Sequence, residues 1–345
     1  MIKVLIVDDS AIVRSLLHQN LKKFSDIEVV GTAVDPYDAR DKIVELKPDV
    51  ITLDLEMPRM NGLEFITVLM EFHPVPILVF SSLVDGECET SLKALELGAL
   101  EVVPKPVHDL ANAIPSISTI LVNKIRGING AKIQIIKANP ETVKQITSLS
   151  NIRPAEKIIA IGSSTGGTEV IRYILEHLPE GTPPIIITQH MPEGFTTTYA
   201  KRLNDLCKYL EVREAESGDV LQHGLALIAP GNYHLILQKD GLKYKVTTKM
   251  SPKVNRFRPS VDVMFLSVAQ TAGKDAIGVI LTGMGSDGAE GLLKMKDSGS
   301  LTIAQSEKSC AVFGMPASAI KKNAVDYIED IEEIPIRLLK ILGKM

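Results

Sequence analysis

The sequence predicts an α/β protein built from two sheet-containing units. In both halves of the 345 residues, short apolar runs alternate with amphipathic segments, which is typical of parallel sheets covered by helices on both faces. Between the halves, residues 129–152 show weaker periodicity and contain Asn, Gly and Pro, as expected of a linker. We therefore expect domains at residues 1–128 and 153–345.

The first half divides into strands and helices in strict alternation. The expected strands are the apolar runs at residues 3–8, 28–33, 49–55, 76–82 and 101–106. The expected helices are the amphipathic segments at residues 10–24, 35–47, 62–73, 87–98 and 114–127. This alternation predicts consecutive βα units around one parallel sheet.

The second half alternates in the same way but contains an insertion. Apolar runs predict strands at residues 157–163, 183–190, 210–215, 224–231, 233–241, 242–249, 276–283 and 300–306. The region from residue 210 to 249 has few helical gaps, and Asp240-Gly241 predicts a tight β-hairpin turn. We therefore expect a doubly wound, mainly parallel α/β sheet with an antiparallel β insertion.

Composition restricts the class of protein. Hydrophobic residues make up 45% and charged residues 23% of the chain, an ordinary balance for a globular protein in water. The formal net charge is -4 with no long basic block, which argues against nucleic acid as a partner. The apolar runs are far too short to cross a bilayer, so we expect no membrane insertion. The 3 cysteines are widely separated and form neither a disulfide framework nor a zinc pattern, which favours a reducing cytoplasm.

Polar side chains gather at the strand ends of the first half. Asp8 and Asp9 end the first strand, and Asp54 ends the third. Ser81 ends the fourth strand, and Lys105 follows the fifth. Because the carboxyl ends of parallel strands share one edge, the three carboxylates should converge, and such a set of oxygen ligands suits Mg²⁺. A single strand-end acid is ordinarily a solvated loop residue, but the whole set at one edge favours a site.

The segments that carry these residues, LIVDDS, LDLEMPRMNG, VFSS and VPKP, closely resemble the receiver domain of two-component response regulators. The resemblance covers about the first third of the chain and implies a flavodoxin-like (βα)5 fold. It implies that Asp54 accepts a phosphoryl group, with a histidine kinase as the donor and Mg²⁺ as the cofactor. The other roles that it implies are ion contacts from Asp9, Asp54 and the backbone carbonyl of Glu56, a water-mediated contact from Asp8, and contacts to the phosphoryl group from Ser81 and Lys105.

In the second half, the stretch IGSSTGGTEV at residues 161–170 joins a predicted strand to a helical pattern. Its GSSTG fits G-x-S-x-G with Ser164 at the centre, and a sharp turn of this kind pushes the central hydroxyl out of the sheet edge. Amides at the start of the helix would stabilise a developing oxyanion. Two alternatives stay open: a turn of small residues without chemistry, and an anion cradle, although the Gly-Lys-Ser/Thr of a phosphate-binding loop is missing.

A serine nucleophile needs a base, and His190 is the best placed of the 7 histidines. It ends the strand expected directly after the Ser164 helix, and consecutive βα units usually place their strands side by side. From position alone, a structural histidine held by hydrogen bonds is an equal alternative. Four other histidines lie on helical or loop stretches and are expected at the surface: His18, His73, His108 and His177.

The third member of a triad should be an acid on the same edge. The apolar strand at residues 276–283 leads into a glycine-rich turn, GMGSDG, that carries Asp287. This turn also matches the dinucleotide-binding pattern G-x-G-x-x-G, but it comes late in its unit and no acid ends the next strand. We prefer the interpretation in which Asp287 orients His190. The chain order Ser164, His190, Asp287 differs from that of α/β-hydrolases.

Six segments of the second half closely resemble the catalytic domain of the chemotaxis protein-glutamate methylesterase family, CheB type: GSSTGGTE, QHMPEGFT, IAPGNYH, NRFRPSVD, LTGMGSDGAEG and SCAVFGMP. The resemblance runs through about residues 154–320. It implies hydrolysis of glutamate methyl esters on the cytoplasmic domains of methylated chemoreceptors, and in many members deamidation of receptor glutamines. It assigns the catalytic roles to Ser164, His190 and Asp287, with no cofactor in this unit.

The same resemblance implies further roles. The backbone amides of Thr165 and Met284 would hold the oxyanion. Arg256 and Arg258, in NRFRPS, would face the substrate, with ordinary surface cations as an equal alternative. A receiver in front of this domain implies that phosphorylation activates hydrolysis.

Two other functions remain open from the sequence. One is a receiver-controlled serine hydrolase or amidase with another substrate, because specificity depends on surface shape. The other is a non-catalytic, phosphorylation-dependent binding module whose glycine-rich turns hold a nucleotide. Labelling by an active-site serine probe would separate either hydrolase from the binding module.

Overall fold

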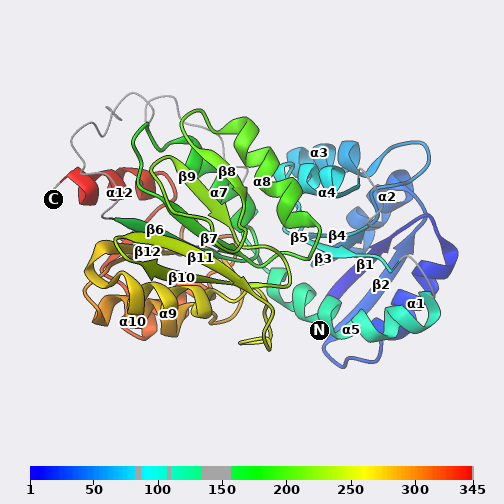
Figure 1. Cartoon of the computed structure of the whole chain (residues 1–345). Coiled ribbons are helices and arrows are strands. Elements are labelled where there is room, and N and C mark those ends of the chain that lie inside the picture. The colour runs from blue at the N-terminus through cyan, green and yellow to red at the C-terminus, as the bar shows by residue number, and fades with distance from the viewer. Residues whose placement is uncertain (82–86, 107–109, 134–156, 344–345) are drawn as a thin grey trace. The chain divides into compact units, whose positions relative to one another are not determined.

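The computed structural model describes residues 1–81, 87–106, 110–133 and 157–343. The chain divides into two compact units, Met1–Ile135 and Ile136–Met345, and each is described by itself (Figure 1). Most of the linker expected at residues 129–152, and also His108, lie outside the described residues. Among the helices in these described ranges, none combines the length and the apolar character that a bilayer crossing requires.

The N-terminal unit is a parallel sheet between two layers of helices. Its strands are β1 (Ile2–Val7), β2 (Ile27–Ala33), β3 (Val50–Leu53), β4 (Ile77–Ser81) and β5 (Glu101–Pro104). Its helices are α1 (Ala11–Leu21), α2 (Pro36–Leu46), α3 (Gly62–Phe72), α4 (Glu87–Glu96) and α5 (Leu110–Ile128). The strand order is β2-β1-β3-β4-β5, with parallel pairing throughout. Helices α1 and α5 cover one face, and α2, α3 and α4 cover the other (Figure 1). The flavodoxin-like (βα)5 prediction is confirmed.

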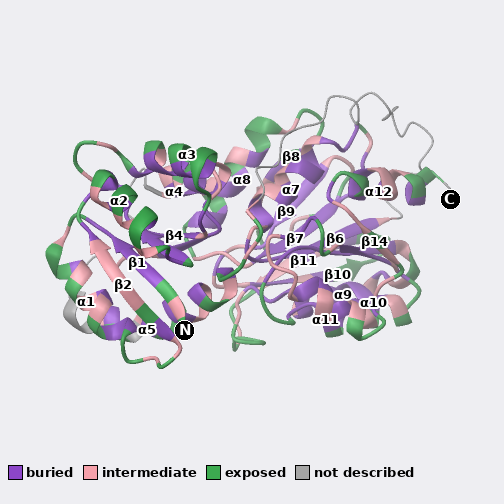
Figure 2. Ribbon diagram, turned by 180° about the vertical axis from the view of Figure 1, so that it is seen from behind, coloured by how far each residue is buried: buried purple, intermediate pink, exposed green. Residues whose placement is uncertain are grey.

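The sequence explains where these elements begin and why the strands are buried. The side chain of Asp35 accepts hydrogen bonds from the amides of Tyr37 (2.9 Å) and Asp38 (3.0 Å), and so caps the start of α2. Asn61 caps α3 in the same way, through the amide of Glu64 at 2.9 Å. Because helices cover both faces of the sheet, β3 and β4 are buried along their whole length (Figure 2).

The C-terminal unit contains a 7-stranded parallel sheet and a separate hairpin. The sheet strands are β6 (Ile158–Ser163), β7 (Ile185–Gln189), β8 (Glu211–Glu214), β9 (Leu225–Ile228), β12 (Ala276–Ile280), β13 (Leu301–Gln305) and β14 (Tyr327–Glu329). Their order is β14-β13-β12-β6-β7-β9-β8, and the pairing is parallel throughout. Strands β10 (His234–Asp240) and β11 (Lys243–Lys249) form the antiparallel hairpin.

Helices cover both faces of this sheet. They are α7 (Gly167–Glu176), α8 (Phe195–Leu206), α9 (Val261–Thr271), a short 3-10 helix η1 (Gly273–Asp275), α10 (Ala289–Asp297), α11 (Met315–Lys321) and α12 (Glu333–Gly343). Helices α9, α10 and α11 lie on one face, and α7, α8 and α12 lie on the other (Figures 1 and 2). The hairpin packs on α9, where the amide of Leu237 donates to Ser267 Oγ at 2.9 Å.

The doubly wound, mainly parallel prediction for this unit is confirmed, with one refinement. Strands β8 and β9 belong to the parallel sheet, so the antiparallel insertion consists of the β10–β11 hairpin and an isolated bridge from Val220 to Lys245 of β11. Strand β14 and the helices α8, α9, α10, α11 and α12 were not assigned from the sequence.

In each sheet, strands are added on both sides of the first strand of the unit, so the direction of strand addition reverses beside that strand. In the N-terminal unit the reversal lies between β1 and β3, and in the C-terminal unit it lies between β6 and β12. At such a point the loops at the carboxyl ends of the strands diverge and leave a crevice, which is where open α/β sheets bind ligands. These two places position the candidate sites.

Candidate active site

Ser164, His190 and Asp287 lie together at the reversal point of the C-terminal sheet. Ser164 follows β6, His190 follows β7, and Asp287 lies in the turn after β12; β6 pairs with both other strands. His190 Nδ1 lies 3.1 Å from Ser164 Oγ, and His190 Nε2 lies 2.8 Å from Asp287 Oδ2. The structure therefore brings the three residues into one chain of hydrogen bonds. The imidazole meets the serine with Nδ1 and the acid with Nε2, the reverse of the arrangement in chymotrypsin.

The turn around Ser164 is fixed from both neighbouring strands. The amide of Ser164 donates to the carbonyl of Thr282 at 3.1 Å, and Gln189 Nε2 donates to the carbonyl of Ser164 at 2.8 Å. Gly166 caps α7 with a φ of 73°, and a Cβ there would lie 2.7 Å from the Cβ of Ala311. The turn therefore requires glycine both for its conformation and for space.

The carboxylate of Asp287 is buried but surrounded by donors. Oδ2 accepts from the amide of Val261 at 2.7 Å, and Oδ1 accepts from Asn255 Nδ2 and from Ser260 Oγ, both at 2.8 Å. Burial by itself would raise the pKa of Asp287, but these donors and His190 outweigh it and lower the pKa to about 2. Asp287 is therefore an ionised partner for the imidazole.

The imidazole of His190 is held between groups on several sides. Its side chain is only 5% exposed. The ring of Phe257 stacks on it, with 3.7 Å between the ring centroids and 9° between the planes. The stack leaves the two ring nitrogens in line with Ser164 and Asp287.

The two residues expected to supply oxyanion donors lie next to Ser164. Thr165 follows Ser164 directly, at the start of α7. Met284 follows Gly283, whose backbone is packed so closely against Ser164 that an added Cβ would lie 2.7 Å from the serine Cβ. Backbone amides at these positions could stabilise negative charge on a carbonyl oxygen under attack.

Acidic groups converge at the reversal point of the N-terminal sheet. The carboxylates of Asp8, Asp9 and Asp54 each offer an oxygen within 4.8 Å of the others. Lys105 Nζ donates to Asp54 Oδ2 at 2.5 Å and to Asp8 Oδ2 at 2.8 Å. Ser81 is buried at the end of β4, and its carbonyl accepts from the amide of Lys105 at 2.7 Å. Burial raises the pKa of Asp54 to about 6, although the charge of Lys105 opposes the shift.

Comparison with known proteins identifies the family. Residues 159–338 match the family described as CheB methylesterase. The chain belongs to the CheB methylesterase family. Residues 4–114 match the response regulator receiver domain, so both resemblances found in the sequence are confirmed.

Relatives align with this CheB-family chain over nearly its whole length. It is 50% identical over 344 residues to "Protein-glutamate methylesterase/protein-glutamine glutaminase 2" of Syntrophus aciditrophicus, covering 99% of both chains. It is 48% identical over 340 residues to the protein-glutamate methylesterase/protein-glutamine glutaminase of Salmonella typhi, covering 98% of this chain and 96% of the relative. The crystal structure of the Thermotoga maritima CheB methylesterase catalytic domain is similar with a TM-score of 0.52 and 41% identity, covering 54% of this chain and 98% of that domain.

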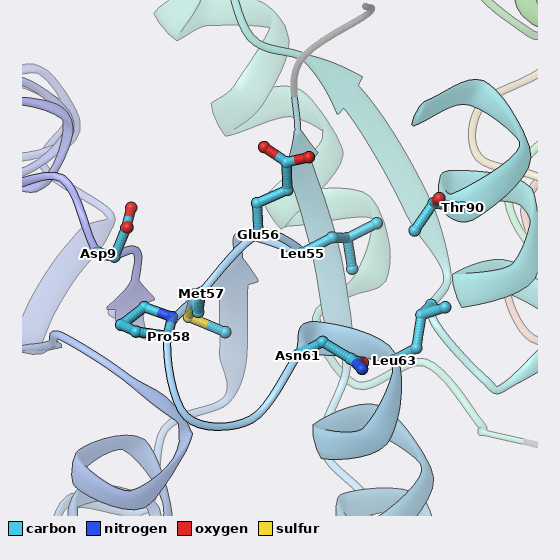
Figure 3. A pocket seen from close by; sticks show the side chains of 8 residues that line it. All are labelled: Asp9, Leu55, Glu56, Met57, Pro58, Asn61, Leu63 and Thr90. Carbon is cyan, nitrogen blue, oxygen red and sulfur yellow. The ribbon is translucent and has the colours of Figure 1, made fainter. Parts of the chain in front are cut away.

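The match to the receiver domain implies a Mg²⁺ ion, and the cluster of Asp8, Asp9 and Asp54 is suited to bind it. Three carboxylates offer hard oxygen ligands, and Asp9 among them is exposed to water. A cavity of about 600 Å³ opens beside the cluster (Figure 3). Figure 3 shows the loop from Leu55 to Asn61 running between Asp9 and Thr90, with the Glu56 side chain beside the opening. The residues that line the cavity are Asp9, Leu55, Glu56, Met57, Pro58, Asn61, Leu63 and Thr90.

The two arginines expected on the substrate side differ in their surroundings. Arg258 is bound within the protein: Nη1 donates to the carbonyl of Ser251 at 2.7 Å, and Nε and Nη2 donate to Asn232 Oδ1 at 3.0 and 2.6 Å. Arg256 is exposed, with a φ of 73°. A contact from Arg256 to a substrate is therefore sterically open, whereas Arg258 organises the loop.

The expectation that His177 lies at the surface is wrong. His177 is buried at the end of α7, and its Nδ1 lies 2.7 Å from the carbonyl of Tyr173. Its ring stacks on that of Tyr173, with centroids 4.1 Å apart. The two residues are one helical turn apart, so they share a face of α7, and that face is covered.

Sequence reasoning missed three side chains that contact His190 or Asp287: Asn255, Phe257 and Ser260. Ser260 had a usable signal, because a serine directly before an apolar helical pattern is a helix N-cap signature, and Ser260 does cap α9. Asn255 and Phe257 lie in the NRFRPS segment, in which the family resemblance assigned roles only to the two arginines. Neither residue ends a strand, so the rule that located the triad did not apply to them.

Proposed function

We propose that this chain hydrolyses glutamate methyl esters on the cytoplasmic domains of chemoreceptors, and that it works in the cytoplasm. Deamidation of receptor glutamines is proposed as a second reaction of the same site. The observation that carries the proposal is the hydrogen-bonded series Ser164–His190–Asp287 at the reversal point of the sheet. The printed names of the full-length relatives supply the substrate class.

In the proposed mechanism, Ser164 Oγ attacks the ester carbonyl carbon while His190 Nδ1 takes its proton. The Nε2 proton of His190 stays hydrogen-bonded to Asp287, whose charge stabilises the imidazolium. Amides of Thr165 and Met284 bind the oxyanion. The tetrahedral intermediate collapses, and the imidazolium gives its proton to the departing methoxide, which leaves as methanol. Water, deprotonated by Nδ1, then attacks the acyl carbonyl carbon; the bond to Ser164 Oγ breaks, and the imidazolium returns the proton to Oγ, which frees the glutamate carboxylate. A glutamine substrate would lose ammonia instead of methanol in the first step.

The central test compares two adjacent serines. Ser164→Ala should lower the rate of methanol release from methyl-esterified receptor by about 10⁶-fold, because the nucleophile is lost. Ser163→Ala is the matched control, since Ser163 Oγ is buried and donates to the carbonyl of Thr282 at 3.2 Å. We expect it to keep much of the activity and to lose about 1 kcal/mol of stability. Near-normal turnover by folded Ser164→Ala would refute the mechanism.

We further propose that a histidine kinase phosphorylates Asp54 and that this activates hydrolysis. Asp9, Asp54 and the Glu56 carbonyl would hold Mg²⁺, which supplies charge neutralisation at the phosphoryl group. Lys105 and Ser81 lie at the same edge to meet the new phosphoryl oxygens.

The phosphorylation proposal has its own test. With Mg²⁺ and a small phosphodonor, the wild-type chain should take up one phosphoryl group, and Asp54→Asn should take up none. Chelation of the ion should stop the wild-type reaction. Undiminished labelling of Asp54→Asn, measured by intact-protein mass, would show that another residue is the acceptor.

A further inference from the structure

Residues 252–260 form a loop, here called the triad loop, that contacts both His190 and Asp287. The buried side chain of His234 holds its two ends: His234 Nε2 lies 3.0 Å from the carbonyl of Pro252, and the amide of Ser260 donates to His234 Nδ1 at 3.2 Å. A neutral imidazole with its proton on Nε2 satisfies both contacts. These two contacts anchor the loop on the β10 strand, and neither of them involves Ser164, His190 or Asp287.

Within the triad loop, a tight turn fixes the direction of two side chains. The amide of Val254 donates to the carbonyl of Phe257 at 3.1 Å, and the amide of Phe257 donates back at 2.8 Å. Between them, Asn255 and Arg256 have φ values of 52° and 73°. Two successive left-handed residues are typical of a type I′ turn, and asparagine tolerates this conformation better than most residues. The side chains of Asn255 and Phe257 thus project from a backbone turn whose conformation is fixed by hydrogen bonds.

The amide of Asn255 joins two carboxylates. Its Nδ2 donates to Asp287 Oδ1 at 2.8 Å and to Asp262 Oδ2 at 2.7 Å. Asp287 and Asp262 are both buried, and the nearby charge of Asp287 adds to burial in raising the pKa of Asp262. A neutral donor between two like charges lowers their repulsion and fixes the distance between them.

Phe257 contacts the imidazole of His190. Its ring lies nearly parallel to the imidazole of His190, 9° from coplanar and 3.7 Å from it between centroids. Any rotation of the imidazole about its Cβ–Cγ bond would drive the ring edge into this face. The stack therefore keeps Nδ1 toward Ser164 while Nε2 remains on Asp287.

We propose that Asn255 and Phe257 are positioning residues for the reaction: Asn255 holds the Asp287 carboxylate, and Phe257 holds the plane of the His190 imidazole. The inference rests on the proposed function, because its kinetic readout is turnover by Ser164. It concerns geometry in the free enzyme, which can also be measured without any substrate.

Kinetics of the full chain on methyl-esterified receptor give the first test. Asn255→Gly removes the amide but accepts the left-handed backbone, and Phe257→Leu keeps an apolar side chain without a ring. Each should lower kcat by about 10- to 100-fold with little change in KM, because misplacement of catalytic groups costs that much. Phe257→Tyr should keep most of the activity. Asn255→Asp should do no better than Asn255→Gly, because it replaces the donor with a third carboxylate.

A matched control separates positioning from a general loss of stability. Asn204 also uses its side chain within this unit, where Oδ1 accepts from the amide of Val212 at 2.9 Å, away from the catalytic residues in the sheet. Asn204→Ala should lose stability without losing kcat. Unchanged kcat in both Asn255→Gly and Phe257→Leu, or an increase in KM alone, would overturn the proposal; the latter would make the residues substrate contacts.

NMR of the ¹⁵N-histidine-labelled full chain supplies a readout that does not depend on turnover. The stacked ring should shift the carbon-bound protons of His190 upfield, and Phe257→Leu should abolish this shift while Phe257→Tyr retains it. Asn255→Gly should move the Nε2 proton signal of His190 through its bond to Asp287. If these signals respond but Ser164→Ala remains active, the proposed function fails and the positioning stands. If Ser164 is essential but the variants change neither signals nor kcat, only this inference fails.

Discussion

At the scale of single residues, Asp287 shows how a buried acid can stay charged. Each carboxylate oxygen has its own donors: Asn255 and Ser260 on Oδ1, and Val261 and His190 on Oδ2. Burial alone would favour the neutral acid, but the hydrogen bonds reverse the effect and bring the pKa to about 2. The carboxylate can therefore hold the imidazole tautomer and stabilise the imidazolium over the whole physiological pH range.

This shift in pKa predicts a pH-dependent loss of stability in Asp287→Asn. Because folding lowers the pKa from 3.8 to about 2, the ionised group stabilises the fold above pH 3.8, and its contribution disappears as the pH falls through about 2. The full contribution is about 2 kcal/mol. Denaturant unfolding at neutral pH should show the variant less stable by about this amount. The gap between the two proteins should narrow below pH 3.8, and a gap that is constant with pH would contradict the assignment.

At the scale of elements, the close approach of α9 to β6 allows the start of α9 to donate a hydrogen bond to Asp287. Gly162 in β6 faces the start of α9, and a Cβ on it would lie 2.1 Å from Val261 Cγ1 and 3.1 Å from Phe265 Cζ. The missing side chain lets the first turn of α9 lie directly on the strand. The amide of Val261 can then reach Asp287 at 2.7 Å.

Gly162→Ala should therefore damage both stability and activity. The overlap with the β-branched Val261 cannot be relieved without moving α9, so we expect a loss of about 1–3 kcal/mol and a lower kcat. Gly278→Ala in β12 is the matched control, because its Cβ would meet the flexible ends of Leu292 (2.6 Å) and Met295 (3.1 Å). We expect a smaller effect there in denaturant unfolding and methanol release. A larger effect at Gly278 would contradict the argument.

The same scale shows what the sequence could and could not predict. Parallel-sheet topology placed functional side chains at strand ends, and the structure brings Ser164, His190 and Asp287 together there. Asn255 was not predicted, because it reaches Asp287 from a loop and does not end a strand. Strands β8 and β9 were expected in an antiparallel insertion, because the chain from residue 210 to 249 has few helical gaps, whereas parallel neighbours usually need a long crossover, often a helix. Here residues 215–224 make the parallel connection without a helix.

At the scale of the whole molecule, two folded units share one chain, and the tether predicted at residues 129–152 is short. A tether of this length would keep the two units at high effective concentration with respect to each other, so that a weak interaction would be enough for control. Phosphorylation of Asp54 would add charge and oxygen acceptors next to Lys105 and Ser81, and so shift a two-state equilibrium in the receiver. We expect the resting receiver to inhibit hydrolysis and the phosphoryl group to relieve the inhibition.

This account of control makes a prediction about a truncated chain. The crystal structure of the Thermotoga maritima relative contains the catalytic domain by itself, so we expect a fragment from about Arg153 onward to fold. We expect the fragment to release methanol from methyl-esterified receptor faster than the unphosphorylated full chain. A phosphodonor with Mg²⁺ should raise the rate of the full chain to that of the fragment and leave the fragment unchanged. If the phosphorylated chain becomes faster than the fragment, the receiver also assists catalysis directly. A fragment slower than the resting full chain would show that the unphosphorylated receiver does not inhibit.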